Sequence, residues 1–484
     1  MSHTNKQPSL LQALIPLMAL IVMLASSVYL FGEDSSYGPN QIALLVASGI
    51  AVIIGFRNGF SWTQIEEGIT EGISVALGAM LIILAVGSLI GTWLLSGTVP
   101  TLIYFGLELL NPGLFYAASC IICGIVALSI GSSWTTAATI GVALMGVASG
   151  MGLEPAIAAG AIVSGAYFGD KMSPLSDTTN LAPAVAGSEL FAHIRYMGYT
   201  AGPAFVISVI LFLILGLNAD TNVSLQRLEQ MQVQLQSTFN IGWEMLVPLA
   251  ILLYLAATRK PALPTVFFGA LLGGAWALIF QPEMVTQIAG EEGWVASLKV
   301  VWLALSDGTS VSTGSANLDS LLSGGGMVSM LNTVWLILSA MTFGAIMEKI
   351  GLLERFIRGM LKASKSVGSL ITGTIFTCFG ANVLTADQYM AIVLPGRMFR
   401  EEYERRNLDP RVLSRTLEDS GTITSALIPW NTCGAYMFSV LAVSPFEYGI
   451  FAFFNYLTPL IAIVFAYTGW TILYKKPEQK EAMA

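Results

Sequence analysis

The chain has 484 residues, of which 55% are hydrophobic and only 11% are charged. Soluble domains carry about 25% charged residues, so this composition excludes an ordinary soluble protein and indicates a membrane protein. In a membrane protein the net charge of −8 says little about nucleic acid, which we do not expect as a partner. The distribution of Lys and Arg between loops carries the information instead.

Apolar runs long enough to cross a bilayer recur along the whole chain. A helix needs about 20 apolar residues to span the hydrocarbon core, and residues 10–31, 73–95 and 198–217 are clear examples. The first run is too long for a cleaved signal peptide and has no small-residue cleavage site, so we expect it to be retained. The sequence predicts an all-α polytopic membrane protein embedded in a lipid bilayer.

Residue types that carry enzyme or transition-metal chemistry are scarce. Cys120 and Cys123 form a C-x-x-C pair, but both lie in an apolar run without a second pair or a histidine cluster. Only two histidines occur in the chain. There is no P-loop and no nucleophile–His–acid arrangement, so we expect a protein that is not an enzyme and that needs no cofactor.

Ordered matches between the two halves predict an internal duplication. "GSSWTTA" begins at Gly131 and "GANVLTA" begins at Gly380. Asp170 follows Gly131 at the same distance as Asp419 follows Gly380. Each match is weak by itself, but all of them occur in the same order, as expected of a repeat.

Loop charges give the two halves opposite orientations. Residues 349–365 carry several Lys and Arg, whereas their counterpart 97–113 carries none. By the positive-inside rule the halves then face opposite ways, which is the inverted-repeat plan of secondary transporters. Residues 397–415 are also basic, and the segment of about 31 residues between the two basic stretches is too short for two crossings. We therefore expect a re-entrant hairpin with its tip near Gly380–Asn382 and, by symmetry, another near Gly131–Ser133.

The expected architecture is two inverted repeats, each with about five transmembrane helices and one re-entrant hairpin, with broken helices at the membrane midplane. Both termini are expected to be cytoplasmic. The predicted divisions are a cytoplasmic N-terminus (1–9), a first repeat (10–218), an external linker (219–240), a second repeat (241–474) and a cytoplasmic tail (475–484).

Polar clusters interrupt the apolar sequence where helices are expected to break. "FGDKMSPLSDTTN" begins at Phe168 and places carboxylates, hydroxyls and an amide around a proline. An ionisable group at membrane depth costs about 2.5–3.5 kcal/mol, so such a group indicates function. Oxygen-only ligands suit alkali and alkaline-earth cations. The four candidate cation-binding carboxylates are Asp170, Asp177, Asp387 and Asp419.

The full predicted ion- or substrate-binding set combines these carboxylates with neighbouring hydroxyls and amides. Its members are Ser132, Ser133, Thr136, Asp170, Ser173, Ser176, Asp177, Thr178, Asn180, Asn382, Thr385, Asp387, Asp419, Thr422, Asn431 and Thr432. A carboxylate that holds either a proton or a metal ion is sufficient to exchange the two. Structural alternatives stay open: a surface loop at Asp170, a helix cap at Asp177, and a surface ion pair between Asp419 and Arg411 or Arg415.

The densest motifs resemble a known family. "GSSWTTAATIGVALMGV", "AGAIVSGAYFGDKMSPLSDTTNLAP" and "LEDSGTITSALIPWNTCGAYM" are similar to segments of the NhaC family of bacterial Na+/H+ antiporters. The resemblance implies a multi-pass protein of the bacterial cytoplasmic membrane, commonly a homodimer, that exchanges Na+ for H+. It also implies an elevator-like or rocking movement of one helix bundle.

Three functions stay open at this stage. Proteins similar to this family exchange organic acids, such as malate against lactate, or carry amino acids. A small carboxylate cargo would need basic residues or helix N-termini, and Lys171 and Arg195 are the bases nearest the polar clusters. Exchange of ions alone is favoured over this alternative, and a cation channel or a membrane subunit of a larger complex is the third.

Overall fold

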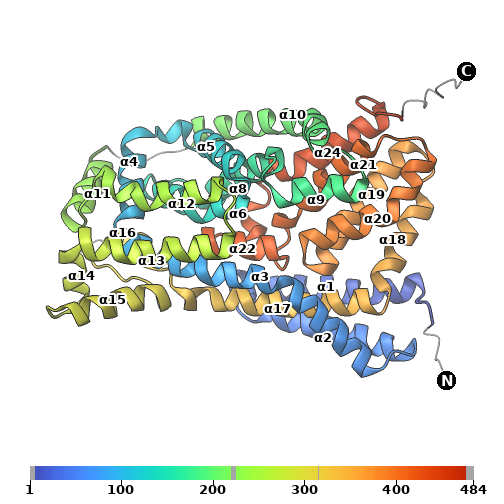
Figure 1. Cartoon of the computed structure of the whole chain (residues 1–484), viewed down its shortest axis with the longest axis horizontal. Coiled ribbons are helices and arrows are strands. Elements are labelled where there is room, and N and C mark those ends of the chain that lie inside the picture. Colours follow the sequence, from blue (N-terminus) through green and yellow to red (C-terminus); the bar gives the residue numbers. More distant parts are fainter. Residues whose placement is uncertain (1–5, 220–224, 314–315, 476–484) are drawn as a thin grey trace, which may run out of the picture.

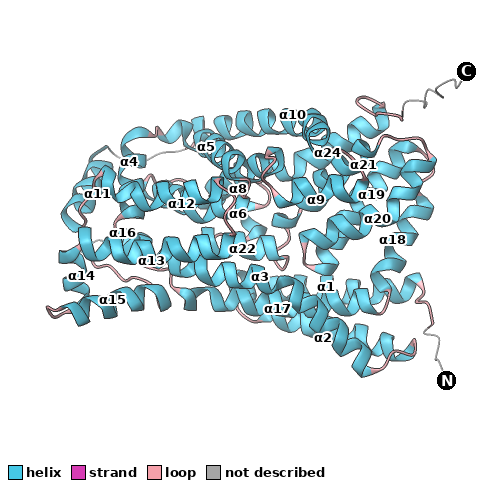
Figure 2. Ribbon diagram, in the orientation of Figure 1, coloured by secondary structure: helices cyan, strands magenta, loops and turns pink. Residues whose placement is uncertain are grey.

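The computed structural model describes residues 6–219, 225–313 and 316–475. Every regular element within these residues is a helix or a helical turn (Figure 2). Eight of the described helices are long and apolar enough to cross a membrane, or up to nine if one bent pair is counted as a span. The prediction of an all-α polytopic membrane protein is therefore confirmed. Most of the expected termini and part of the expected linker lie outside the described residues.

The helices of the first half have the following bounds: α1 (Leu10–Phe31), α2 (Pro39–Arg57), α3 (Trp62–Leu95), α4 (Thr98–Leu109), α5 (Phe115–Ile130), α6 (Ser133–Thr136), α7 (Val142–Gly150), α8 (Pro155–Met172), α9 (Asp177–Ala186) and α10 (Leu190–Leu217). A π-helical turn, Ala137–Gly141, joins α6 to α7.

Those that follow have these bounds: α11 (Leu225–Thr238), α12 (Val247–Ala257), α13 (Ala262–Phe280), α14 (Pro282–Ala289), α15 (Trp294–Ser306), α16 (Ala316–Leu322), α17 (Leu331–Lys349), α18 (Leu352–Ala363), α19 (Val367–Thr385), α20 (Gln388–Arg405), α21 (Pro410–Leu417), α22 (Thr432–Leu441), α23 (Pro445–Tyr448) and α24 (Phe453–Thr468). A second π-helical turn, Glu418–Thr422, continues α21.

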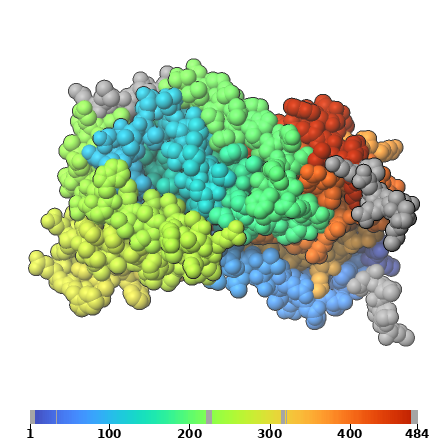
Figure 3. Space-filling view, turned by 45° about the horizontal axis from the view of Figure 1, so that its top comes forward, coloured from blue at the N-terminus to red at the C-terminus, as the bar shows by residue number. Residues whose placement is uncertain are grey.

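Two groups of helices pack separately and meet along the centre of the molecule (Figure 1). The first group contains α1, α2, α3, α13 and α17, and the second contains α5, α8, α10, α19, α20, α21 and α24. The space-filling view shows α4 and α5, in cyan, lying directly against the yellow-green region of α11 and α12 (Figure 3). Among the broken helices, α22 packs against α3 and α17 of the first group, whereas α6 and α9 pack on the second group, to which α20 also belongs.

The two halves repeat the same local backbone in a nearly constant register of 254 or 255 positions. The α4 and α18 helices have 12 residues each, and each follows a left-handed glycine, Gly97 (φ 79°) or Gly351 (φ 77°). Likewise, α9 and α22 have 10 residues each and end before the left-handed residues Gly187 and Ala442, which are 255 positions apart. The same helix lengths and caps therefore recur in both halves.

The chain breaks also recur in this register. In the first half α5 ends at left-handed Gly131 and Ser132 caps the next helix. In the second half α19 ends at left-handed Ala386 and Asp387 caps the next helix, again 255 positions later. The N-caps Ser176 and Asn431 are separated by the same number. The structure thus contains an internal repeat, whereas its inversion with respect to a membrane stays a prediction.

The expected tip of the second hairpin was misplaced. Residues 380–382 lie inside α19, and the chain breaks instead at Ala386 and Asp387. The physical reason is that Gly380 lies inside α19, which continues to Thr385, and Ala386 takes the left-handed conformation that Gly131 takes in the first half. Matching Gly131 with Gly380 therefore shifts the two halves out of register. The corresponding match of Asp170 with Asp419 is wrong for the same reason.

Candidate functional site

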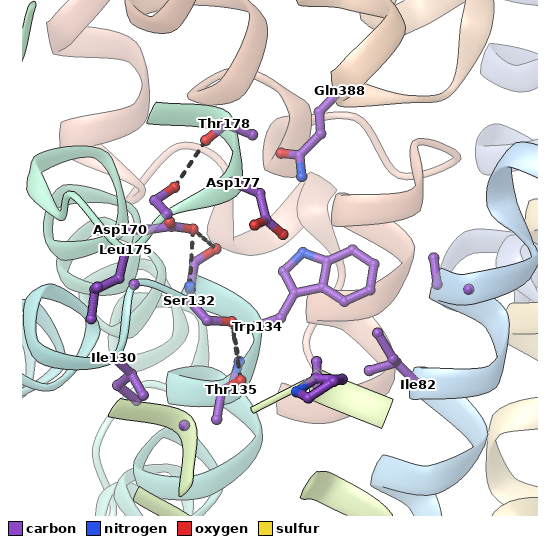
Figure 4. A pocket seen from close by; sticks show the side chains of 18 of the residues that line it. Ile82, Ile130, Ser132, Trp134, Thr135, Asp170, Leu175, Asp177, Thr178 and Gln388 are labelled. Atoms are coloured by element: carbon purple, nitrogen blue, oxygen red, sulfur yellow. Dashed lines mark hydrogen bonds between the residues drawn. The ribbon is translucent and has the colours of Figure 1, made fainter. Parts of the chain in front are cut away.

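A cavity with a volume of about 720 Å³ lies where the two helix groups meet (Figure 4). One wall consists of the first turns of α6, α9, α20 and α22. The opposite wall consists of residues 75–82 of α3 and residues 256–266 of the α12–α13 hairpin. The polar first turns of these four helices therefore face the apolar residues of α3 across the cavity.

The structure brings part of the predicted binding set to this cavity. The members that line it are Ser132, Ser133, Asp170, Ser176, Asp177, Thr178, Asn180, Asp387 and Thr432. The members that do not line it are Thr136, Ser173, Asn382, Thr385, Asp419, Thr422 and Asn431. Three of the four candidate carboxylates thus share one cavity, although they come from both halves of the chain.

Four helix N-termini converge at the cavity because each of these helices begins at a polar cap. Each cap side chain accepts a hydrogen bond from a backbone N–H of its own first turn, at 2.9 to 3.4 Å. The four caps are Ser132, Ser176, Asp387 and Asn431. Helix N-termini carry partial positive charge and stabilise nearby carboxylates. The cavity can therefore hold several acidic side chains without basic partners.

Asp170 is the carboxylate that joins two of these elements. It lies in the last turn of α8 and is half-buried. Its Oδ2 accepts hydrogen bonds from the backbone N–H of Ser133 at 3.0 Å and from the hydroxyl of Ser133 at 2.6 Å. A negative charge at a helix C-terminus is unfavourable. The N-terminal turn of α6 offsets that cost and fixes the orientation of the carboxylate.

Asp177 and Asp387 differ in exposure. Asp177 is the first residue of α9 and is exposed, and its carboxylate lies between Gln388 and Trp134 (Figure 4). Asp387 is only 4% exposed and caps α20. Among the described residues, neither of these carboxylates nor Asp170 makes an ion pair. All three are therefore unpaired with the described basic side chains, although Arg259 and Lys260 line the same cavity.

Aromatic and basic residues that the sequence analysis did not place in the site also line the cavity. Trp134 stacks on Tyr436 with ring centroids 4.1 Å apart, and the Tyr436 hydroxyl donates to the Trp134 carbonyl at 2.9 Å. Arg259 and Lys260 line it from the α12–α13 hairpin. Further members are Thr135, Gln388 and Tyr389. The repeat register identifies Gln388 and Tyr389, because they are equivalent to Ser133 and Trp134.

Asp419 lies in a buried ionic network instead of the cavity. Its Oδ1 is 2.8 Å from Lys171 Nζ, and both side chains are fully buried. Thr200 donates to the same oxygen at 3.0 Å, and Arg415 Nε lies 3.7 Å from Oδ2. The alternative of an ion pair with Arg415 identified a correct partner, but the pair is buried and Lys171 is the closer cation.

The other predicted residues outside the cavity support the chain breaks. Asn382 donates through Nδ2 to the carbonyl of Gly421 at 2.6 Å. Asn431 donates through Nδ2 to Asn382 Oδ1 at 3.1 Å. Thr385 donates to the carbonyl of Ala381 at 2.9 Å, within its own helix. These groups satisfy backbone and side-chain atoms where helices are interrupted, as buried polar groups require.

The amino-acid sequence is similar to those of known antiporters over most of its length. Residues 165–470 match the Na+/H+ antiporter family. The chain is 39% identical over 439 residues to the malate-2H(+)/Na(+)-lactate antiporter of Bacillus subtilis, covering 90% of this chain and 91% of that protein. It is 39% identical over 429 residues to the Na(+)/H(+) antiporter NhaC of Alkalihalophilus pseudofirmus, covering 89% and 90%. It is 36% identical over 481 residues to the arginine/ornithine antiporter ArcD of Halobacterium salinarum, covering 98% and 95%.

Proposed function

The chain belongs to the Na+/H+ antiporter family, and from this premise we propose that it is a secondary active transporter that exchanges Na+ for H+. The proposal places it in the bacterial cytoplasmic membrane as a multi-pass homodimer with both termini in the cytoplasm. The transported ions are then its only ligands besides lipid, without a cofactor and without enzyme chemistry.

The observation that carries the proposal is the shared cavity of Asp170, Asp177 and Asp387. Carboxylate, hydroxyl and amide oxygens are the ligands that hard cations such as Na+ prefer. A carboxylate binds either Na+ or a proton, so the two ions compete for one site. If the loaded site faces each side of the membrane in turn, this competition converts a gradient of one ion into movement of the other.

Within this mechanism Asp170 is the main exchange carboxylate. Ser133 holds one of its oxygens by two hydrogen bonds, so its position does not depend on the bound ion. Asp177 and Asp387 add negative charge to the same cavity. The Trp134–Tyr436 stack closes part of the wall with apolar rings, which lowers the local dielectric and strengthens the attraction for a cation.

Proton movement in sealed proteoliposomes tests the proposal. Vesicles that contain only this protein and a pH-sensitive dye receive a pulse of Na+ without any organic acid. We expect a prompt, Na+-dependent change in internal pH, and the same pulse of choline chloride gives no response. Absence of any Na+-driven proton movement at all pH values would exclude Na+/H+ exchange.

A small organic carboxylate is the second candidate cargo, and two features of the cavity favour it. Its volume of about 720 Å³ lies in the range typical of small-molecule sites and far exceeds what one ion needs. Arg259 and Lys260 line it and make no ion pair among the described residues, so they are available to a carboxylate. The same vesicles with malate and lactate on opposite faces test this candidate. A response to Na+ only in their presence would favour it over exchange of ions alone.

A further inference from the structure

The buried pair between Lys171 and Asp419 lies directly behind the cavity. Lys171 follows Asp170 in the last turn of α8, and consecutive helical side chains point about 100° apart. Asp170 therefore faces the cavity while Lys171 reaches into the protein. The pair joins α8 of the first repeat to the π-helical turn that follows α21 in the second repeat.

Both partners of this pair are held by further groups. Thr200 on α10 donates to Asp419 at 3.0 Å, and the Arg415 guanidinium lies 4.3 Å above the Tyr196 ring. The Thr179 hydroxyl donates to the Lys171 carbonyl at 3.0 Å and so ties the end of α8 to the start of α9. The last turn of α8 is thus fixed through both its backbone and its side chain.

Stability alone does not explain a fully buried ion pair. The cost of removing two charges from water commonly equals or exceeds their attraction, so apolar residues of similar size often stabilise a protein as well. A turn at a helix end beside a chain break is, by contrast, a segment that frays unless something holds it. The ion pair supplies a directional contact that an apolar pair does not.

We propose that Lys171 and Asp419 are positioning residues, whose ion pair fixes the last turn of α8 so that Asp170 meets both the Ser133 turn and the transported cation. This inference rests on the proposed function. It replaces the predicted role of Asp419 as a cavity carboxylate, because its Oδ1 is occupied by Lys171 and Thr200. Mutation of a group that orients a metal ligand typically weakens metal affinity by about 10–100-fold.

The decisive variant is the uncharged pair K171M/D419L. Single replacements leave one buried charge unpaired and are expected to fold poorly. The double variant removes both charges of this pair but leaves the buried Arg415 without its nearby carboxylate, so we expect a lower melting temperature and compare Na+ affinity well below that temperature. We also expect the half-saturating Na+ concentration to rise by about 10–100-fold, with the maximal rate of exchange retained. Equilibrium binding of 22Na+ to purified protein and Na+-driven proton movement in vesicles give the two readouts.

Matched variants separate positioning from general damage. E354Q/R358Q removes an exposed ion pair on α18 and is expected to leave Na+ affinity unchanged. D419E retains both charges but lengthens one side chain by a methylene, so it is expected to weaken Na+ binding without unfolding the protein. It is the test to use if K171M/D419L does not fold. Unaltered Na+ affinity in a folded K171M/D419L or D419E protein overturns the positioning role.

The experiment also distinguishes this inference from the proposed function. If the unaltered protein neither binds 22Na+ nor moves protons in response to Na+, the proposed function fails, and the positioning role fails with it. If the unaltered protein does both and K171M/D419L retains its affinity, only the positioning role fails.

Discussion

The chain breaks of the two repeats have the same backbone but carry different chemistry. Ser132 and Asp387 occupy equivalent N-caps, and both line the cavity. Asp177 is equivalent to Thr432, which also lines the cavity from the first position of its helix. In each of these pairs one half supplies a carboxylate and the other a hydroxyl.

The third carboxylate follows the same rule. Asp170 is equivalent to Ser425, which is buried and donates its hydroxyl to the Thr422 carbonyl at 2.6 Å. The repeat therefore conserves where helices start and stop, whereas the charge at each equivalent position is present only once. This difference suggests that a duplicated scaffold can position ligands from both halves without doubling the negative charge in the cavity.

The largest expected effect comes from the Asp170–Ser425 pair. D170N removes the negative charge for which Na+ and H+ compete. Losing one partner of a desolvated charge pair, here the carboxylate that faces Na+, costs about 2–5 kcal/mol, which corresponds to a loss of Na+ affinity of roughly 30-fold or more. We expect Na+-driven proton movement to fall below detection while the protein still inserts and elutes as a single species. S425A removes only a hydroxyl and is expected to retain exchange. Equal losses in the two variants would show that the halves are not specialised in this way.

Moving a carboxylate between equivalent caps is the next sharpest test. D387S replaces one good N-cap with another, so the helix start is preserved while the cavity loses a charge. We expect the half-saturating Na+ concentration to rise by about tenfold, which corresponds to about 1.4 kcal/mol. S132D/D387S returns a carboxylate to the equivalent position, and we expect it to recover most of that loss. Failure to recover would mean that the two caps are not equivalent for ion binding.

The left-handed residues at the two breaks should differ in how well the protein tolerates their substitution. A Cβ on Gly131 (φ 74°) would lie 2.7 Å from the Leu175 carbonyl carbon and 2.8 Å from the Ser176 nitrogen. G131A should therefore destabilise the protein by more than about 1 kcal/mol. A386G relieves about 1 kcal/mol of left-handed strain and adds a similar entropic cost, so its stability should hardly change. Thermal unfolding in detergent measures both, and a tolerated G131A would contradict the tight packing at this break.

Sequence reasoning identified the membrane class, the first break and most of the polar residues at the cavity. The break inferred by symmetry near Gly131–Ser133 coincides with left-handed Gly131, whereas the cap of α9 is Ser176 and not Asp177, which is the first residue of the helix.

Sequence reasoning misplaced the second break because the left-handed residue there is Ala386. Glycine is the usual residue in that conformation, so an alanine gives no sign of it in the sequence. The match of Gly131 with Gly380, which lies inside α19, then shifted every later pairing, including that of Asp170 with Asp419.

The side-chain partners were beyond the reach of the sequence. Lys171 and Asp419 are 248 positions apart and belong to different halves of the chain, so only the folded arrangement brings the end of α8 to the π-helical turn after α21. The contribution of Arg259 and Lys260 to the cavity was missed because a basic loop is also what membrane topology predicts. Long-range contacts of this kind depend on the folded arrangement and not on a local pattern.

The smallest expected effect concerns the pair of Asp177 and Thr432, of which Asp177 is exposed. An exposed charge pair, here the Asp177 carboxylate and Na+, contributes only about 0.2–1 kcal/mol. D177N should therefore raise the half-saturating Na+ concentration only about two- to fivefold at low ionic strength, and the difference should shrink as choline chloride screens the charge. T432D adds a carboxylate at the equivalent helix start. In the D177N background it should therefore lower the half-saturating Na+ concentration again. A complete loss of exchange in D177N would instead make this exposed carboxylate an obligatory ligand, and the specialisation of the two halves would then extend from the buried break to the mouth of the cavity.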